Sequence, residues 1–203
     1  MLQYNTKHLI ARVISTLFVP PSFALILFIF FAFKYEDDPN KILLSVLVTL
    51  TFSFLFPIIL FIILRKQGKI VDADANIKEE RTFPLIISAL FYSIGILILI
   101  KAQINIVSIA LWFCYISNTI FIIIINKYWK ISAHMMGASG PFAAVCFVYG
   151  LSALPFILIL FMIGWARIFL KCHNIYQVLA GGLLGFTSTI LQMQIITGIY
   201  NAR

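Results

Sequence analysis

Carboxylates are scarce in this 203-residue chain, and none follows Glu80. The seven acidic residues lie in two short polar segments: Glu36, Asp37 and Asp38, and then Asp72, Asp74, Glu79 and Glu80. The absence of acidic side chains from the last three-fifths of the sequence therefore excludes three kinds of site there: a carboxylate-bridged metal cluster, a carboxylate proton relay and the acidic pair that glycosidases use. Chemistry in that region has to depend on histidine, arginine, hydroxyl and backbone groups.

Cysteine and histidine are also few, with three of each. Cys114, Cys146 and Cys172 lie in or beside apolar runs, where a free thiol behaves as a small hydrophobe. Their number and spacing predict neither a disulfide framework nor a paired-cysteine metal site. We expect no metal and no other cofactor, and we interpret His8, beside Lys7, as an interfacial residue.

Charged residues make up only 11% of the chain, whereas 62% of it is hydrophobic and the mean hydropathy is +1.04. A soluble fold of this size cannot bury so much apolar surface. Apolar runs close to the ~20 residues needed to cross a bilayer recur along the whole sequence. We predict an all-α, polytopic transmembrane helix bundle of six to seven spans in a single domain, residues 1–203. The bilayer is then a partner, a nucleic acid is not, and the oligomeric state is left open.

Seven candidate spans can be drawn: Leu9–Phe33, Ile42–Leu64, Pro84–Ile100, Ile104–Ile125, His134–Tyr149, Pro155–Leu170 and Ile175–Ile199. The first is too long for a signal-peptide core and is interpreted as a retained helix. The fifth and sixth share about 33 residues, or roughly 50 Å of helix, whereas two full crossings need nearly 60 Å. Either two short helices flank a turn at 150–155, or residues 141–165 form one kinked span. We favour two short helices, because a single span would place His134 and His173 on opposite sides of the membrane.

Positive charge is unevenly distributed over this map. Eleven of the fifteen lysines and arginines fall on the side of the amino terminus, the exceptions being Lys34, Lys41, Lys101 and Arg203. By the positive-inside rule that side is cytoplasmic. The inference weakens if Lys78, Arg81, Arg167 and Lys171 bind an anion, because these cations would then be present whichever way they faced.

Two polar segments at predicted helix ends could carry chemistry. The first is Ile131-Ser132-Ala133-His134, followed by Gly137, and it combines a hydroxyl, a helix start and small residues, which suit an oxyanion. In the second, Arg167 precedes His173 by six residues, and Gln177 follows His173 by four. That spacing places Gln177 where it can accept a hydrogen bond from one ring nitrogen of His173 and leave the other free.

These segments, together with Lys78-Glu79-Glu80-Arg81-Thr82-Phe83-Pro84, resemble the three signature segments of the type 2 phosphatidic acid phosphatase superfamily, in a divergent bacterial branch. The matching regions are about 74–84, 131–140 and 166–177. The resemblance implies that His173 is the nucleophile, that His134 is the general acid, and that Arg81, Arg167 and Ser132 hold phosphate. It also implies a metal-independent hydrolase of a bacterial inner membrane. The two short helices imply that the site is recessed at one membrane face.

The chain departs from the family pattern at several positions. Asp74 stands where the family has a lysine, and Lys78 is our candidate to replace that cation. Gln177 replaces an aspartate that orients the nucleophilic histidine and stabilises the positively charged form of its ring. Ile131, Ala133 and Ala166 also differ from the usual residues.

The leading hypothesis is a lipid phosphatase acting on a phosphomonoester or diphosphate through a phosphohistidine. The main alternative is a degenerate member that binds lipid phosphates without hydrolysing them. A prenyltransferase using Asp72 and Asp74 with Mg²⁺ lacks a second acidic cluster, and a small transporter lacks a detectable inverted repeat.

Overall fold

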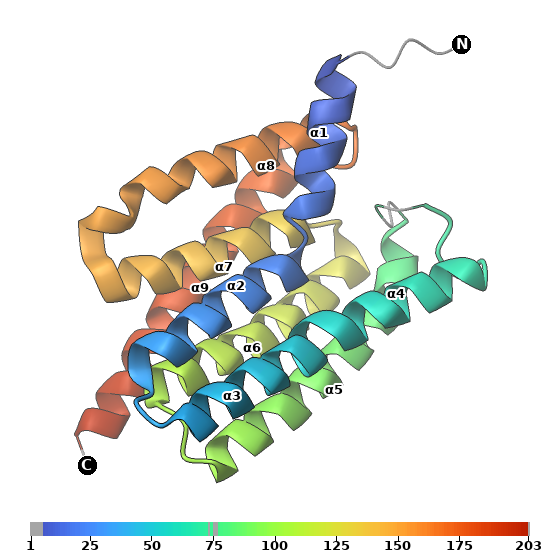
Figure 1. Ribbon diagram of the computed structural model, residues 1–203. Helices are drawn as coiled ribbons and strands as arrows, with labels where there is room; N and C mark the ends of the chain where they lie inside the picture. Colours follow the sequence, from blue (N-terminus) through green and yellow to red (C-terminus); the bar gives the residue numbers. More distant parts are fainter. Residues whose placement is uncertain (1–5, 73, 75–76, 203) are drawn as a thin grey trace.

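The computed structural model describes residues 6–72, 74 and 77–202, and these contain helices but no strands. The elements are α1 (Thr6–Leu17), α2 (Pro20–Tyr35), α3 (Pro39–Val48), the π-helical η1 (Thr49–Leu55), α4 (Phe56–Lys66), α5 (Lys78–Lys101), α6 (Ile106–Tyr128), α7 (Ala133–Tyr149), the 3₁₀ segment η2 (Gly150–Phe156), α8 (Ile157–Phe169) and α9 (Ile175–Asn201). Figure 1 shows α2 to α9 as a bundle of roughly aligned helices.

The helices bury an aromatic core and leave many large apolar side chains outside. Trp112 is almost fully buried and stacks on Phe28 with 4.7 Å between ring centroids. Leu97, Phe161 and Leu183 are each about two-thirds exposed, as expected for side chains that face lipid. Five helices are long and apolar enough to cross a membrane, or six if the bent pair α1 and α2 forms one span, which indicates an integral membrane protein.

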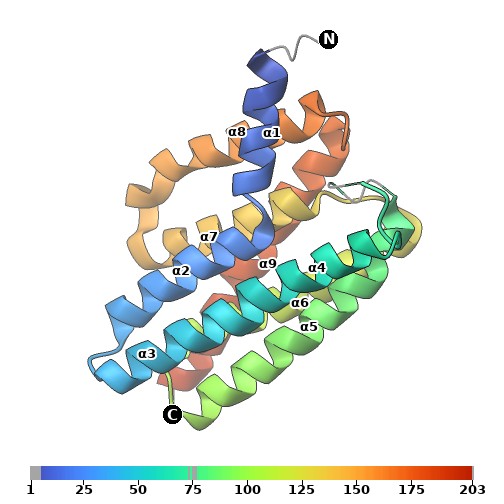
Figure 2. The same cartoon turned by 45° about the vertical axis from the view of Figure 1, so that its right-hand side comes forward.

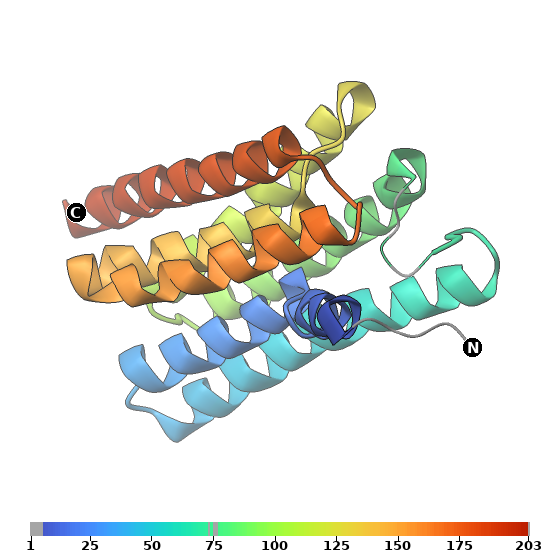
Figure 3. The same cartoon turned by 90° about the horizontal axis from the view of Figure 1, so that it is seen from above.

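The first predicted span is broken, because α1 and α2 meet at an angle of 52°. The break falls at Pro20 and Pro21, which lack the backbone N–H groups that would continue the helix. Figure 3 shows α1 nearly end-on while the other helices lie across the view. This turn lays α1 against α8 at one end of the bundle, so the expectation of one continuous helix over residues 9–33 is wrong.

Helix α5 begins at Lys78, six residues before the predicted start at Pro84. Glu79 and Glu80 lie in its first turn, where negative charge stabilises the helix N-terminus. Arg81 is consequently placed on the first turn of a helix rather than in a loop.

The second predicted span is also longer than expected, since α3, η1 and α4 run continuously from Pro39 to Lys66.

The chain reverses direction between α7 and α8. His134, at the start of α7, and Arg167, near the end of α8, both contact Ser15. A straight helix would separate their positions by roughly 50 Å, so residues 133–169 must fold back on themselves. The reversal occurs at η2, where Gly150 has a φ of +60°, and it is visible in Figures 1 and 2. The turn predicted at 150–155 is confirmed, and the single kinked span is wrong.

Candidate functional site

The two histidine segments meet because α7 and α9 pack very closely. Ser132 N donates to the carbonyl of Gln177 across 3.2 Å. A Cβ added to Gly181 would come 2.5 Å from the Ser132 carbonyl oxygen, so only glycine permits this approach. Ser139 Oγ also donates to the Gly181 carbonyl at 3.4 Å. Small residues on both helices therefore bring residues 131–134 beside the start of α9.

His173 is held by the N-terminal cap of α9. Asn174 caps the helix, and Gln177 Oε1 accepts hydrogen bonds from the Asn174 backbone N–H at 3.2 Å and from His173 Nδ1 at 3.0 Å. Because an amide oxygen can only accept, the proton resides on Nδ1 and Nε2 carries the lone pair. The hydrogen bond that the four-residue spacing predicts is thus present.

The second ring nitrogen of His173, Nε2, is buried and has no hydrogen-bond partner in the described part of the chain. Burial, reinforced by the positive charges of Arg81 and Arg167, lowers the pKa of His173 to about 3, against an opposing contribution from the Gln177 hydrogen bond. The imidazole is therefore neutral at pH 7, which is the form that a nucleophile requires.

Arg167, near the end of α8, is fully buried. Its Nη1 donates to Ser15 Oγ at 2.6 Å and to the Asp74 carboxylate at 2.5 Å. Arg12 binds the other oxygen of the same carboxylate. Burial alone would raise the pKa of Asp74, but the charge of Arg167 and hydrogen bonds from both arginines lower it to about 2. Asp74 is accordingly an anion at neutral pH.

His134 lies on the first turn of α7 and faces α1. Its Nε2 is 3.2 Å from the backbone carbonyl of Ser15. Since a carbonyl can only accept, the proton of this ring is on Nε2. Ser15 thus binds His134 through its carbonyl and Arg167 through its hydroxyl, which keeps the two side chains in one site.

Arg81 approaches the site from α5 and is buried. Its guanidinium reaches the carbonyl oxygens of Ile131 at 3.4 Å and Asp74 at 3.5 Å. Lys130 lies close by and donates to the Cys172 carbonyl at 2.7 Å. Burial, together with the charges of Arg81 and Arg167, lowers the pKa of Lys130, as expected where several cations gather.

Two of the residues expected to bind phosphate are placed elsewhere. Lys78 Nζ donates to the Lys127 carbonyl at 3.1 Å, so its position does not replace the missing cation. Ser132 is fully buried, and its hydroxyl caps α7 by accepting from Met135 N at 3.3 Å. Neither residue is among the described residues that line the cavity considered next. Arg167 does not line it either, but it contacts Ser15 and Asp74, which do.

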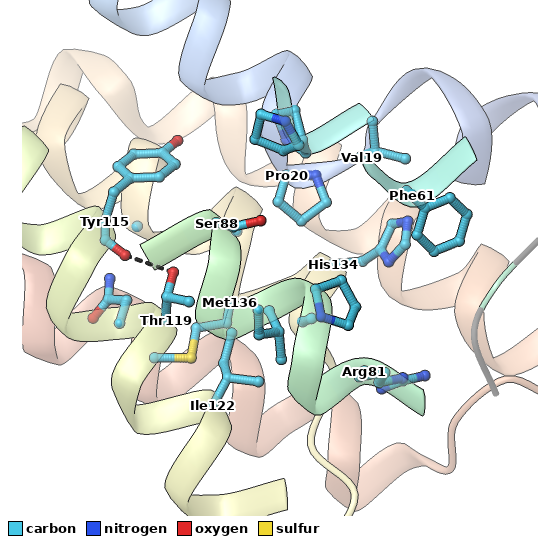
Figure 4. Close-up of a pocket in the computed structure, with 18 of the residues that line it drawn as sticks. Val19, Pro20, Phe61, Arg81, Ser88, Tyr115, Thr119, Ile122, His134 and Met136 are labelled. Carbon is cyan, nitrogen blue, oxygen red and sulfur yellow. Dashed lines mark hydrogen bonds between the residues drawn. The ribbon is translucent and has the colours of Figure 1, made fainter. Parts of the chain in front are cut away.

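A cavity of about 460 Å³ extends from this site into the bundle. Its charged and histidine side chains are Arg12, Asp74, Arg81, His134 and His173, whereas the rest of the wall is mostly apolar and includes Pro20, Tyr115, Ile122 and Met136. Figure 4 shows His134 and Arg81 on one side of this cavity, with Tyr115 and Thr119 on the opposite side. The arrangement suits a ligand with an anionic head and an apolar body.

Sequence reasoning missed the contribution of α1. Arg12 and Ser15 are three residues apart and therefore share a helix face, but only the bend at Pro20 and the packing of α1 on α8 bring that face to the site. The available signal was Asp74, because a carboxylate in a segment that is expected to bind an anion implies additional cations nearby.

The described residues contain no group of three or more histidine, cysteine, aspartate or glutamate side chains placed to hold a metal ion. Asp72 accepts a hydrogen bond from the backbone of Asp74, and the Asp74 side chain is bound by arginines. The paired aspartates required by the prenyltransferase alternative are thus directed to other partners.

No protein-family model, no curated protein and no solved structure matches this chain, so any assignment of function depends on the geometry described above.

Proposed function

We propose that this protein is a membrane lipid phosphatase related to the type 2 phosphatidic acid phosphatases, which hydrolyses a phosphate or diphosphate ester through a phosphohistidine. One observation carries the proposal. His173, whose neutral ring has an unbonded Nε2, lines the same cavity as His134 and Arg81, and the rest of that cavity is mostly apolar. A nucleophile, a second imidazole and cations are the groups that metal-free phosphoryl transfer needs.

The chemistry proceeds in two displacements. His173 Nε2 attacks phosphorus, the bond from phosphorus to the lipid oxygen breaks, and His134, after taking up a second proton on Nδ1 beside the bound phosphate, gives that proton to the departing alkoxide. Water then attacks phosphorus, the bond from phosphorus to His173 Nε2 breaks, His134 takes a proton from that water, and inorganic phosphate leaves. Arg81 and Arg167 neutralise the equatorial phosphate oxygens during both steps.

Helix lengths support a site that is recessed below the membrane surface. The chain passes along the bundle seven times if α1 and α2 are one pass and α7 and α8 are two. Helix α7 has 17 residues and α8 has 13, or about 26 Å and 20 Å, both shorter than a hydrocarbon core of roughly 30 Å. A lipid headgroup could then reach His173 laterally, with its tail in the cavity. We place the protein in a bacterial inner membrane.

A second candidate is binding of lipid phosphates without hydrolysis. Two observations favour it: Asp74 occupies the centre of the arginine cluster, and the neutral Gln177 replaces the carboxylate that would stabilise a cationic imidazole. Both features reduce the catalytic advantage of the site without removing its affinity for anions.

The test is phosphate release by the purified protein in detergent micelles. The panel contains a phosphatidic acid, a polyprenyl diphosphate and a soluble phosphate ester without a tail. We expect hydrolysis of a tailed substrate by the wild type, loss of turnover by at least a thousandfold in His173→Ala, and near wild-type turnover in the matched control His8→Ala. With an activated ester, whose leaving group needs no proton, an acid-labile phosphoenzyme should accumulate in His134→Ala.

The outcomes separate the candidates. Wild-type hydrolysis by His173→Ala would overturn the proposed mechanism. Saturable binding of the lipid phosphates without release of phosphate by any variant would establish the binding function instead.

A further inference from the structure

The Asp74 carboxylate occupies an unusual position for an acidic side chain in a proposed phosphate site. One oxygen is bound by Arg12 Nη1, and the other accepts from Arg167 Nη1 at 2.5 Å and from Ser15 Oγ at 3.4 Å. The side chain is only 9% exposed. Guanidinium groups bind carboxylate and phosphate oxygens with the same hydrogen-bond geometry. The carboxylate therefore marks a position where the protein binds an anion.

Arg167 retains donors that this carboxylate does not use. The Arg167 side chain is inaccessible to solvent, yet its Nε and Nη2 have no hydrogen-bond partner among the described residues. Buried, unsatisfied guanidinium donors are costly and call for a partner. A carboxylate has two oxygens, whereas a phosphate has at least three that can accept. The site thus has more donors than its internal anion can satisfy.

We propose that Arg12 and Ser15 of α1 are phosphate-binding residues, and that Asp74 stands in for the phosphate and is displaced when a phosphate group binds. The inference rests on the proposed function only in taking phosphate as the ligand. It assigns to the N-terminal helix a direct part in the site, and it makes Asp74 an intramolecular competitor. The kink at Pro20 has the role of bringing the Arg12 and Ser15 face of α1 to Arg167.

Displacement has a favourable charge balance. The carboxylate contributes one negative charge, whereas a phosphomonoester dianion contributes two to the same arginines. Asp74 belongs to the segment between α4 and α5, so it can leave the site without unwinding either helix. Substitution of Asp74 by a neutral residue should therefore strengthen phosphate binding, and loss of the Arg12 side chain should weaken it.

The test measures binding, with inorganic phosphate and a short-chain phosphatidic acid as probes. The full-length protein in detergent at low salt is titrated by calorimetry. We expect Asp74→Asn to tighten the binding of at least one probe fivefold or more, and Arg12→Gln to weaken it tenfold or more. Arg65→Gln, which removes an equally positive but exposed residue at the end of α4, is the matched control and should change neither constant. A response of both probes identifies any phosphate as the ligand, and a response of the lipid alone identifies the headgroup.

A thermal-shift series covers the case in which Asp74→Asn is too unstable for calorimetry. Removal of the carboxylate leaves Arg167 without its counter-charge, so the variant should melt at a lower temperature than the wild type. Saturating phosphate should then raise its melting temperature more than that of the wild type, because a ligand that binds only the folded state stabilises it. Ser15→Ala gives an independent arm and should weaken phosphate binding about threefold.

Two results would overturn the inference. If Asp74→Asn weakens phosphate binding or leaves it unchanged, Asp74 orients the arginines and does not compete with the ligand. If Arg12→Gln behaves like Arg65→Gln, α1 takes no part in the site. Neither result depends on turnover, so absence of hydrolysis with intact phosphate binding refutes the proposed phosphatase and leaves this inference standing.

Discussion

Gln177→Glu is the most informative substitution, because it changes the charge behind the proposed nucleophile without changing its geometry. Gln177 Oε1 lies 3.0 Å from His173 Nδ1 and 3.2 Å from Asn174 N. Glutamate has the same length and keeps an oxygen at that position. Aspartate is one methylene shorter and would lose both contacts. Any effect of Gln177→Glu therefore reports the charge.

The size of the effect can be worked out from Coulomb's law. During attack on phosphorus the His173 ring becomes positive, and a unit negative charge about 3 Å away would stabilise it by roughly 5 kcal/mol at an effective dielectric constant of 20. Repulsion from the phosphate, about 7 Å away, and desolvation of the carboxylate remove about half of this or more. A net 1–3 kcal/mol corresponds to an increase in kcat of roughly 5- to 150-fold.

The pH profile gives a second readout. Burial and the charges of Arg81 and Arg167 hold the pKa of His173 at about 3, so protonation of His173 should not limit wild-type activity until the pH falls toward that value. A carboxylate at position 177 favours the protonated ring and raises this pKa. The acidic limb of kcat/KM should therefore move to higher pH in Gln177→Glu, whereas the exposed control Gln67→Glu should leave it in place.

Gln177→Leu tests the orienting role alone. It leaves the Nδ1 proton of His173 without an acceptor in a buried site, at a cost of about 1–3 kcal/mol, and frees the ring to adopt the other tautomer. We expect kcat to fall by roughly 10- to 100-fold. Wild-type kcat and an unshifted pH profile in both Gln177→Leu and Gln177→Glu would refute the reasoning.

Three further predictions concern packing, metals and topology. Gly181→Ala should lower the free energy of unfolding by about 1–3 kcal/mol in chemical denaturation and reduce turnover, because the new methyl group would press on the Ser132 carbonyl. Gly198→Ala, where a Cβ meets open space, should be neutral or stabilising by up to about 1 kcal/mol. A chelator should leave phosphate release unchanged while vanadate inhibits it, and an obligatory Mg²⁺ requirement would contradict the mechanism. In a cysteine-free background, single cysteines near Lys69, Lys127 and Lys171 should label from one membrane face, and those near Asp38 and Lys101 from the other. Labelling at 127 and 171 from opposite faces would separate the two histidine segments and exclude the proposed site.

Local sequence was enough to predict the class of protein and several local contacts. Hydropathy alone indicates a helical membrane protein, because only helices satisfy their backbone hydrogen bonds within one apolar segment. The four-residue spacing of His173 and Gln177 predicts their hydrogen bond, and Gly150 and Pro155 predict the turn between α7 and α8. These features depend on neighbours within one helix or one turn, so the sequence determines them directly.

Only the tertiary structure decided what surrounds the histidines. Asp74 meets Arg12 and Arg167 across 62 and 93 residues of sequence, and Arg167 meets Ser15 across 152. Such pairings depend on the bend at Pro20, on α1 packing against α8 and on the glycine contacts between α7 and α9. No local pattern encodes them, because hydropathy predicts where a helix lies in lipid but not which neighbour it packs against. The expected cation Lys78 therefore lies outside the site, and an unexpected carboxylate lies within it.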